Sequence, residues 1–270
     1  MAGRGESPDF VEALARGLDV IASFGPARPR QTLSDVAQAT GLARPTARRL
    51  LLTLQELGYV HSRDGVFELT PRVMTLGTAF VSSLGLWEIA RPRMEWLVAR
   101  TGESSSMAQL AGSDIVYVAR VSVPKIIALR VEVGTLFPAP PTSQGKVLLA
   151  ALSEDELAAV LEEPSRSGVE PRKRYAAGEL AEELRTVRAR GWALADEELA
   201  AGVRSVAVPV RDGTGATRAA MNVTVHAAET SLETLLEEHL PLLQRVAGEV
   251  SADWAMWQAR PLVVAAPVRS

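Results

Sequence analysis

The order of short elements in the first quarter of the chain restricts its fold more than any other feature. Apolar spacing predicts a short helix over residues 34–41 and a second over 44–57, separated by a turn that follows a glycine. Two short strands, 59–63 and 66–70, come next, and Asp64-Gly65 between them is a strong hairpin signal. Helix, turn, helix and hairpin in this order are typical of a winged helix-turn-helix.

The helix expected over 44–57 has an apolar side and a basic side. The apolar positions, which predict the buried side, are Ala47, Leu50, Leu51, Leu54 and Leu57. Arginine in the first half of a recognition helix can pair with a guanine edge or a phosphate, and a hairpin tip can touch the DNA backbone. The residues that we expect to contact DNA are Ser34, which we also expect to cap the preceding helix, with Arg44, Thr46, Arg48, Arg49 and Arg63.

Charge is distributed unevenly along the chain. The net charge is −3, yet residues 26–63 hold six arginines against Asp35 and Glu56. A basic segment on an acidic chain favours a polyanion such as double-stranded DNA as the partner of that segment. The alternative is a protein-interaction module whose arginines form a solvated face, but the arginines fall on the end of the helix that enters the groove.

Composition excludes several classes of function. The chain has no cysteine, so it has no disulfide framework, thiolate metal site or cysteine nucleophile. His61, His226 and His239 are not at ligand spacing, and we expect neither a metal nor another cofactor. No apolar run is long enough for a membrane span and no secretory signal is visible, which predicts a cytoplasmic location and no membrane partner. Gly145-Lys146-Val147 lacks the remainder of a phosphate-binding loop, and no G-x-S-x-G motif occurs.

The second part of the chain reads as a mixed α/β domain. We expect a winged helix over residues 1–70, a linker helix over 71–84 that Thr70 and Pro71 open, an α/β domain over 85–255, and a disordered tail over 256–270. The strands predicted in this domain are 105–110, 115–121, 126–133, 192–195, 204–210 and 217–225. Its predicted helices are 86–100, 143–152, 154–162, 179–190 and 230–254, the last bent near Pro241.

Polar residues interrupt the apolar pattern of this domain at three places. Ser143, Gln144 and Gly145 open a helix, where free N–H groups and a partial positive charge could hold a carboxylate. Ser205 lies within an apolar strand, and Asn222 and Thr224 are two residues apart, which places them on one side of their strand. Each group also has a purely structural interpretation: a helix cap, a core hydroxyl, or the solvated side of a strand.

Several sequence blocks resemble the IclR family of bacterial transcriptional regulators. They include TLSDVAQATGLARPTARRLLLTLQELGYV in the first part and PAPPTSQGKVLLAAL and AAMNVTVHA in the second, and the resemblance covers roughly residues 9–254. It is closest to the branch that regulates protocatechuate, 4-hydroxybenzoate and β-ketoadipate catabolism. The resemblance implies a GAF-like effector-binding domain over 85–255 and an α+β fold overall. It also implies dimers through the N-terminal domain and linker helix, often paired into tetramers.

The resemblance also implies which residues line the effector pocket. The matching positions are Ser143, Gln144, Ser205, Asn222 and Thr224, and the family places the segment around Asp196 at the pocket edge. We add Gly145, whose N–H lies at the helix start.

The resulting prediction is a DNA-binding regulator. A small organic acid, aromatic or dicarboxylic, would bind it, and a homodimer or tetramer would read a pseudo-palindromic operator. Candidates for the dimer interface are the apolar face of a helix over 9–24, Phe80 and Val81. Two other functions stay open: a ligand-sensing protein–protein adaptor, and an enzyme that acts on a small aromatic acid.

Overall fold

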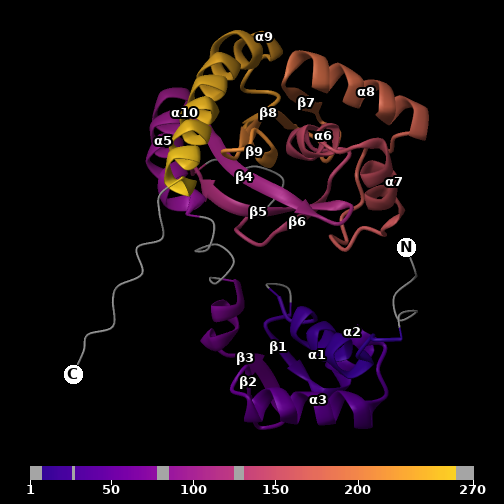
Figure 1. The fold of residues 1–270 in the computed structure, drawn as a ribbon. Coiled ribbons are helices and arrows are strands. Elements are labelled where there is room, and N and C mark those ends of the chain that lie inside the picture. The colour runs from indigo at the N-terminus through magenta and orange to yellow at the C-terminus, as the bar shows by residue number, and fades with distance from the viewer. Residues whose placement is uncertain (1–7, 26–27, 78–84, 125–130, 260–270) are drawn as a thin grey trace, which may run out of the picture. The chain divides into compact units, whose positions relative to one another are not determined.

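The computed structural model describes residues 8–25, 28–77, 85–124 and 131–259. The chain divides into two compact units, Met1–Ser83 and Leu84–Ser270 (Figure 1). Each unit has its own hydrophobic core.

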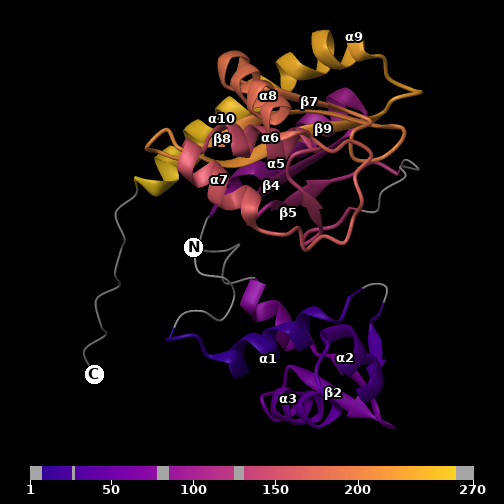
Figure 2. The same cartoon turned by 90° about the vertical axis from the view of Figure 1, so that its right-hand side faces the viewer.

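The first unit consists of three helices and a small antiparallel sheet. The helices are α1 (Glu12–Ala22), α2 (Leu33–Thr40) and α3 (Arg44–Glu56). The strands are β1 (Arg30–Thr32), β2 (Val60–Arg63) and β3 (Val66–Leu69), in the order β1-β3-β2. Figure 2 shows the three helices packed together beside the β2–β3 hairpin. The predicted helix-turn-helix and hairpin are both present.

Local chemistry explains where these elements start and stop. Asp64 and Gly65 both have positive φ, 53° and 76°, as the turn of a two-residue hairpin requires. Gly41 ends α2 with φ 67°. The prediction that Ser34 caps α2 is wrong: Thr32 is the N-cap, and it forms a capping box with Asp35. Asp35 accepts hydrogen bonds from the Thr32 N–H and hydroxyl, and these bonds lower its pKa.

The core of this unit forms where the helices meet the sheet. Ala47, Leu51 and Leu54 of α3 are buried in it together with Val36 and Phe67. Leu50 is only partly buried. The prediction that Leu57 is buried is wrong, because α3 ends at Glu56 and the Leu57 side chain is 51% exposed.

The linker helix is described only at its start. Thr70 caps it by accepting a hydrogen bond from the Arg72 N–H, and a 3-10 turn over Pro71–Val73 continues as α-helix through residue 77. Phe80 and Val81 lie outside the described residues.

The second unit is built on a six-stranded antiparallel sheet in the order β6-β5-β4-β9-β8-β7. The strands are β4 (Ser104–Ala111), β5 (Asp114–Val121), β6 (Leu136–Pro138), β7 (Ala193–Asp196), β8 (Val203–Arg211) and β9 (Thr217–His226). Of the strand predicted over 126–133, residues 126–130 lie outside the description and 131–133 are not strand.

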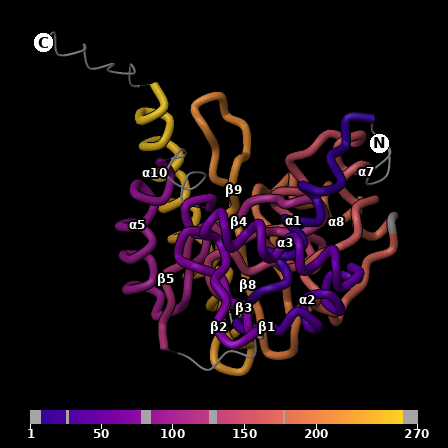
Figure 3. Tube along the Cα trace, turned by 90° about the horizontal axis from the view of Figure 1, so that it is seen from below, coloured from indigo at the N-terminus to yellow at the C-terminus, as the bar shows by residue number. Residues whose placement is uncertain are grey.

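Helices cover both faces of this sheet. They are α5 (Leu86–Thr101), α6 (Ser143–Ala150), α7 (Glu154–Glu162), α8 (Ala177–Arg190), α9 (Leu232–Thr234) and α10 (Leu240–Gln258). The side-by-side helices α5 and α10 pack on one face, as Figure 3 also shows, and α6 with α8 covers the other. Ser153 and Glu156 form the predicted capping box of α7. Two layers of helix around an antiparallel sheet agree with the predicted α+β fold.

The last helix is irregular near Pro241, as predicted, but it ends later than predicted. A π-helical segment, Leu235–His239, joins α9 to α10 directly before Pro241. Proline has no N–H to donate, so a local widening of the helix is a common response. Helix α10 then continues to Gln258, so the predicted tail boundary at 256 is wrong by one helical turn. None of the described helices is both long and apolar enough to cross a bilayer.

Candidate functional site

The exposed side of α3 carries the predicted arginines. Arg44, Arg48 and Arg49 are exposed, and Thr46 is half-buried, while Ala47 on the opposite side is completely buried. The apolar side of the helix therefore holds it against the core and directs the basic side to solvent.

These arginines are available to an anionic partner. Among the described residues, no carboxylate forms an ion pair with Arg44, Arg48 or Arg49, whereas Arg30 pairs with Glu68 at 2.9 Å. The first turn of α3 contains no acid, and no side chain caps its N-terminus. A helix start of this kind attracts phosphate.

The two other predicted DNA contacts lie on the same unit. Arg63 is 89% exposed at the hairpin and lies 3.9 Å from Asp64. Ser34 is exposed in the first turn of α2. Both side chains are exposed to solvent, as contact with a DNA backbone requires.

A pocket on the α6 side of the large sheet brings together five of the residues predicted to bind an effector. Ser143, Gln144, Ser205, Asn222 and Thr224 all line it. Its empty space, including the open mouth, is about 520 Å³. The enclosed cavity itself is about 40 Å³, so the lining side chains must move apart to admit a ligand larger than a few waters.

Strand register explains how the floor of this pocket forms. Arg120 on β5 faces Ser106 on β4, which faces Asn222 on β9. In a neighbouring row, Thr224 faces Ser205 on β8. Facing residues of antiparallel strands project from the same side of a sheet, so four strands contribute polar side chains to one surface.

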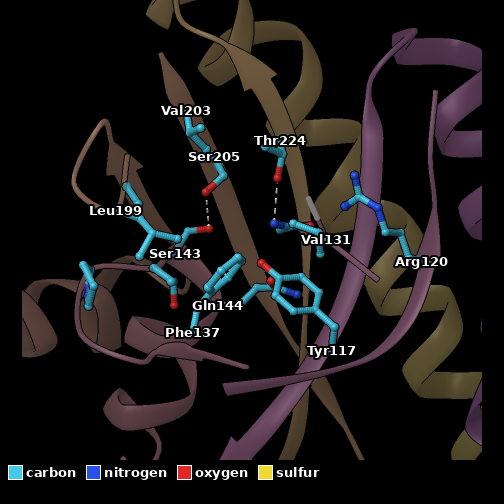
Figure 4. Close-up of a pocket in the computed structure, with 14 residues that line it drawn as sticks. Tyr117, Arg120, Val131, Phe137, Ser143, Gln144, Leu199, Val203, Ser205 and Thr224 are labelled. Atoms are coloured by element: carbon cyan, nitrogen blue, oxygen red, sulfur yellow. Dashed lines mark hydrogen bonds between the residues drawn. The ribbon is translucent and has the colours of Figure 1, made fainter. Parts of the chain in front are cut away.

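Hydrogen bonds pair the polar groups of the pocket (Figure 4). The hydroxyls of Ser143 and Ser205 are 2.7 Å apart. The Asn222 amide donates to the Thr224 hydroxyl at 2.9 Å, and its carbonyl oxygen accepts from the Ser106 N–H at 3.0 Å. Asn222 is only 3% exposed, so the interpretation that it lies on a solvated strand face is wrong.

Gln144 keeps an unused hydrogen-bond acceptor. Its Nε2 donates to the carbonyl oxygens of Ser106 and Ala220, at 3.0 and 2.9 Å, which fixes the orientation of the amide. Its Oε1 is buried and accepts no hydrogen bond from any described residue. An unsatisfied buried acceptor is costly unless a ligand or water supplies the donor.

Tyr117 and Arg120 are among the pocket residues that sequence reasoning missed. On a regular strand, residues three apart point to opposite faces. Here Met107 pairs with Ala119 and Ala108 pairs with Tyr117, so Val118 is an extra residue in a β-bulge. Because the bulge reverses the alternation, Tyr117 and Arg120 both reach the pocket. The only signal in the sequence was an arginine within an otherwise apolar strand.

Burial changes the acid–base properties of both residues. It raises the pKa of Tyr117 to about 12, although the nearby Arg120 acts in the opposite direction. It also lowers the pKa of Arg120. An arginine starts from so high a value that it stays charged near neutral pH, and the phenol stays neutral. The pocket therefore contains one fixed positive charge.

Two predicted residues do not line the pocket. Asp196 points away from it and pairs with Arg204 at 2.7 Å, while its neighbour Ala195 lines the pocket instead. Gly145 is buried behind the start of α6, where a side chain would collide with the backbone of Ala139. Its role is to allow α6 and the preceding loop to approach closely.

An ion-pair cluster around Lys146 holds α6 in place. The Lys146 side chain on α6 is 1% exposed, and its ammonium group donates to Glu198 Oε1 at 2.8 Å and to the Leu194 carbonyl at 2.7 Å. Tyr175 donates to the other Glu198 oxygen at 2.7 Å. These bonds tie α6 to the segment after β7, whose Leu199 lines the pocket.

Comparison with known proteins identifies the family. The family model for the bacterial transcriptional regulator IclR C-terminal domain matches residues 78–252, and the IclR helix-turn-helix model matches residues 13–64. The Pca regulon regulatory protein of Pseudomonas putida is 37% identical over 237 residues, which cover 87% of this chain and 81% of that protein.

Solved structures have the same fold. The crystal structure of a transcriptional regulator from Rhodococcus sp. RHA1 is 48% identical, with a TM-score of 0.77, and covers 92% of this chain and 100% of that one. A double mutant of the PobR inducer-binding domain from Acinetobacter, in complex with 3-hydroxybenzoic acid, is 29% identical, with a TM-score of 0.54. It covers 61% of this chain and 96% of that one. The chain belongs to the IclR family of bacterial transcriptional regulators.

Proposed function

We propose that this protein occupies a specific operator through its winged helix and that a small aromatic acid in the pocket changes this occupancy. The observation that carries the proposal is that Ser143, Gln144, Ser205, Asn222 and Thr224, from three separate parts of the chain, line one pocket. A polar pocket in one unit and an exposed basic helix in the other suit a protein that senses a ligand and binds DNA.

The lining of the pocket supports an aromatic ligand. Tyr117 and Phe137, which pack edge to face with ring centroids 5.7 Å apart, both line it. Apolar side chains such as Leu199 and Val203 complete the wall. A flat apolar body with oxygen atoms at its rim fits such a surface. The related PobR domain that was crystallised with 3-hydroxybenzoic acid supports the same class of ligand.

We also propose that the protein acts as a homodimer, or as a tetramer made of two such dimers, on a pseudo-palindromic operator. Leu14 and Leu18 on α1 are 64% and 54% exposed, and Val11 beside them is 61% exposed. Apolar residues exposed together on one helix favour an interface with a second copy. Two copies would present two recognition helices, as half-sites one DNA turn apart require.

The acid is expected to be bound and released unchanged. The two serine hydroxyls in the pocket hydrogen-bond to each other, and no histidine is among the described lining residues to activate them as nucleophiles. Binding would act instead by favouring one of two arrangements of the DNA-binding helices. It can do so only to the extent that its affinity for the two arrangements differs.

The test begins by selecting an operator from random duplexes with the purified protein. Fluorescence anisotropy then measures the affinity for that operator with and without 4-hydroxybenzoate. We expect the acid to change the operator affinity about 5- to 150-fold, the usual range of allosteric coupling. The double variant Ser143→Ala/Ser205→Ala should keep the operator affinity of the free protein and lose most of the response.

Two results would contradict the proposal. Failure to select any duplex would refute DNA binding. A protein that selects an operator but responds to no aromatic acid, or a double variant with the full response, would refute the effector site.

A further inference from the structure

Arg120 is the one cationic side chain among the described residues that line the pocket, and none of those residues is an anion. Its Nη1 donates to the Ser106 hydroxyl at 2.9 Å, and none of the described carboxylates pairs with it. A partly buried charge without a counter-ion is unfavourable, and a bound anion would relieve that cost.

Tyr117 lies close to Arg120 in the pocket lining. The Tyr117 hydroxyl lines the same pocket and makes no hydrogen bond to another described residue. The β-bulge at Val118 directs both side chains inward, at the expense of regular pairing with β4. Bulges of this kind occur next to binding sites, where they re-aim a side chain.

A second polar group lies at the other end of the pocket. Figure 4 shows Arg120 on one side and the Ser143–Ser205 pair on the other, with Tyr117 between them. Arg120 is on β5 and Ser205 on β8, with β4 and β9 between, so their backbones are about 14 Å apart across the sheet. One carboxylate cannot touch both ends, because its two oxygens are separated by only about 2 Å and a hydrogen bond adds about 3 Å.

We propose that Arg120 binds a carboxylate of the effector and that the Ser143–Ser205 pair binds a second oxygen-bearing group, so the effector is an acid with polar groups at both ends. This inference rests on the proposed function and goes further, because it assigns the effector's negative charge to one side chain. The sequence pattern alone predicted that the carboxylate binds at the start of α6, whereas this inference places it at Arg120.

Hydroxybenzoates and short dicarboxylates share this two-ended chemistry. With 4-hydroxybenzoate, the carboxylate would lie on Arg120 and the hydroxyl at the serine pair, where it could donate a hydrogen bond to the unpaired Oε1 of Gln144. With adipate, a second carboxylate would lie at the start of α6. Benzoate, which has only one polar end, should bind more weakly than 4-hydroxybenzoate.

The test is a double-mutant cycle between the arginine and the ligand charge, measured by calorimetry. The ligands are 4-hydroxybenzoate and its neutral amide, 4-hydroxybenzamide. We expect the wild type to bind the acid about 10- to 100-fold more tightly than the amide, as a charge-assisted pair predicts. Arg120→Gln should bind the acid more weakly by a similar factor and no longer distinguish it from the amide.

Two further variants separate this role from a structural one. Arg120→Lys keeps the charge but not the planar fork, and should bind the acid with intermediate affinity. Arg185→Gln removes an arginine that is 65% exposed on α8 and should behave as the wild type. All variants should keep the operator affinity of the free protein, and none should lower its melting temperature.

The outcomes distinguish this inference from the function on which it rests. If the wild type binds 4-hydroxybenzoate or adipate and Arg120→Gln retains both the affinity and the preference for acid over amide, Arg120 is not the anchor. Equal binding of acid and amide by the wild type overturns the inference even if the glutamine variant does not fold. If the wild type binds no organic acid, the proposed effector site itself fails.

Discussion

Replacing Lys146 with methionine should lower the free energy of unfolding of the second unit by about 3–5 kcal/mol. Methionine nearly conserves the volume, so the cost would arise from electrostatics and not from a cavity. The change removes the 2.8 Å ion pair with Glu198 and the bond to the Leu194 carbonyl. Glu198, 14% exposed, would then keep only its hydrogen bond from Tyr175.

A second substitution tests the reasoning behind this magnitude. Burial lowers the pKa of Lys146 even though Glu198 and Glu183 act to raise it, so desolvation outweighs the attraction of the pair. The cost of Lys146→Met should therefore come mainly from the stranded carboxylate. Adding Glu198→Gln neutralises that group, and the double variant should recover about 2 kcal/mol relative to Lys146→Met alone.

Tryptophan fluorescence in urea is a suitable assay. All five tryptophans, at positions 87, 96, 192, 254 and 257, belong to the second unit, so the signal reports the unfolding of that unit. Glu170→Gln is the matched control, because it breaks a pair with Arg174 in which both side chains are about three-quarters exposed, and it should cost less than about 1 kcal/mol. The reasoning is refuted if Lys146→Met falls within 1 kcal/mol of the wild type, or if the two substitutions add.

Three other predictions concern the start of α6, DNA binding and assembly. Gly145→Ala should destabilise the second unit by more than about 2 kcal/mol and abolish effector binding, because the new methyl group collides with the backbone of Ala139. Gly248→Ala, in the open middle of α10, is the control and should stabilise the same unit by about 0.5–1 kcal/mol. Urea titrations of the two variants measure both free energies of unfolding. Arg48→Ala should weaken operator binding about 5- to 100-fold, and an unchanged gel-shift titration at fixed salt would contradict this role. Leu14→Glu with Leu18→Glu should shift the sedimentation coefficient toward the monomer; an unchanged value would place the interface elsewhere.

Local patterns in the sequence predicted the elements well where neighbouring residues decide them. The periodicity of 44–57 predicted α3 to within one residue, and Asp64-Gly65 predicted the hairpin, because both depend on contacts within a few positions. The capping box of α7 followed from four consecutive residues for the same reason. Predictions failed where two local solutions compete: Thr32, not Ser34, caps α2, because β1 ends in an extended residue two positions before Ser34.

The lining residues of the pocket likewise include some that the sequence predicted and some that it did not. Family resemblance and the two-residue spacing of Asn222 and Thr224 predicted five lining residues, since each lies on a regular element with a predictable face. The resemblance also suggested Asp196, but strand alternation directs that side chain to Arg204 and turns Ala195 inward.

The amino-acid order alone determined that this chain has a winged helix with a basic outer side and an antiparallel α/β domain with buried polar groups. Those properties follow from periodicity, turn chemistry and charge along short stretches. Only the tertiary structure decided that Arg120 and Tyr117 share the pocket with the serine pair. The bulge that turns them inward exists because β5 pairs with β4 in a shifted register, and that pairing depends on residues in two strands and not on either strand by itself.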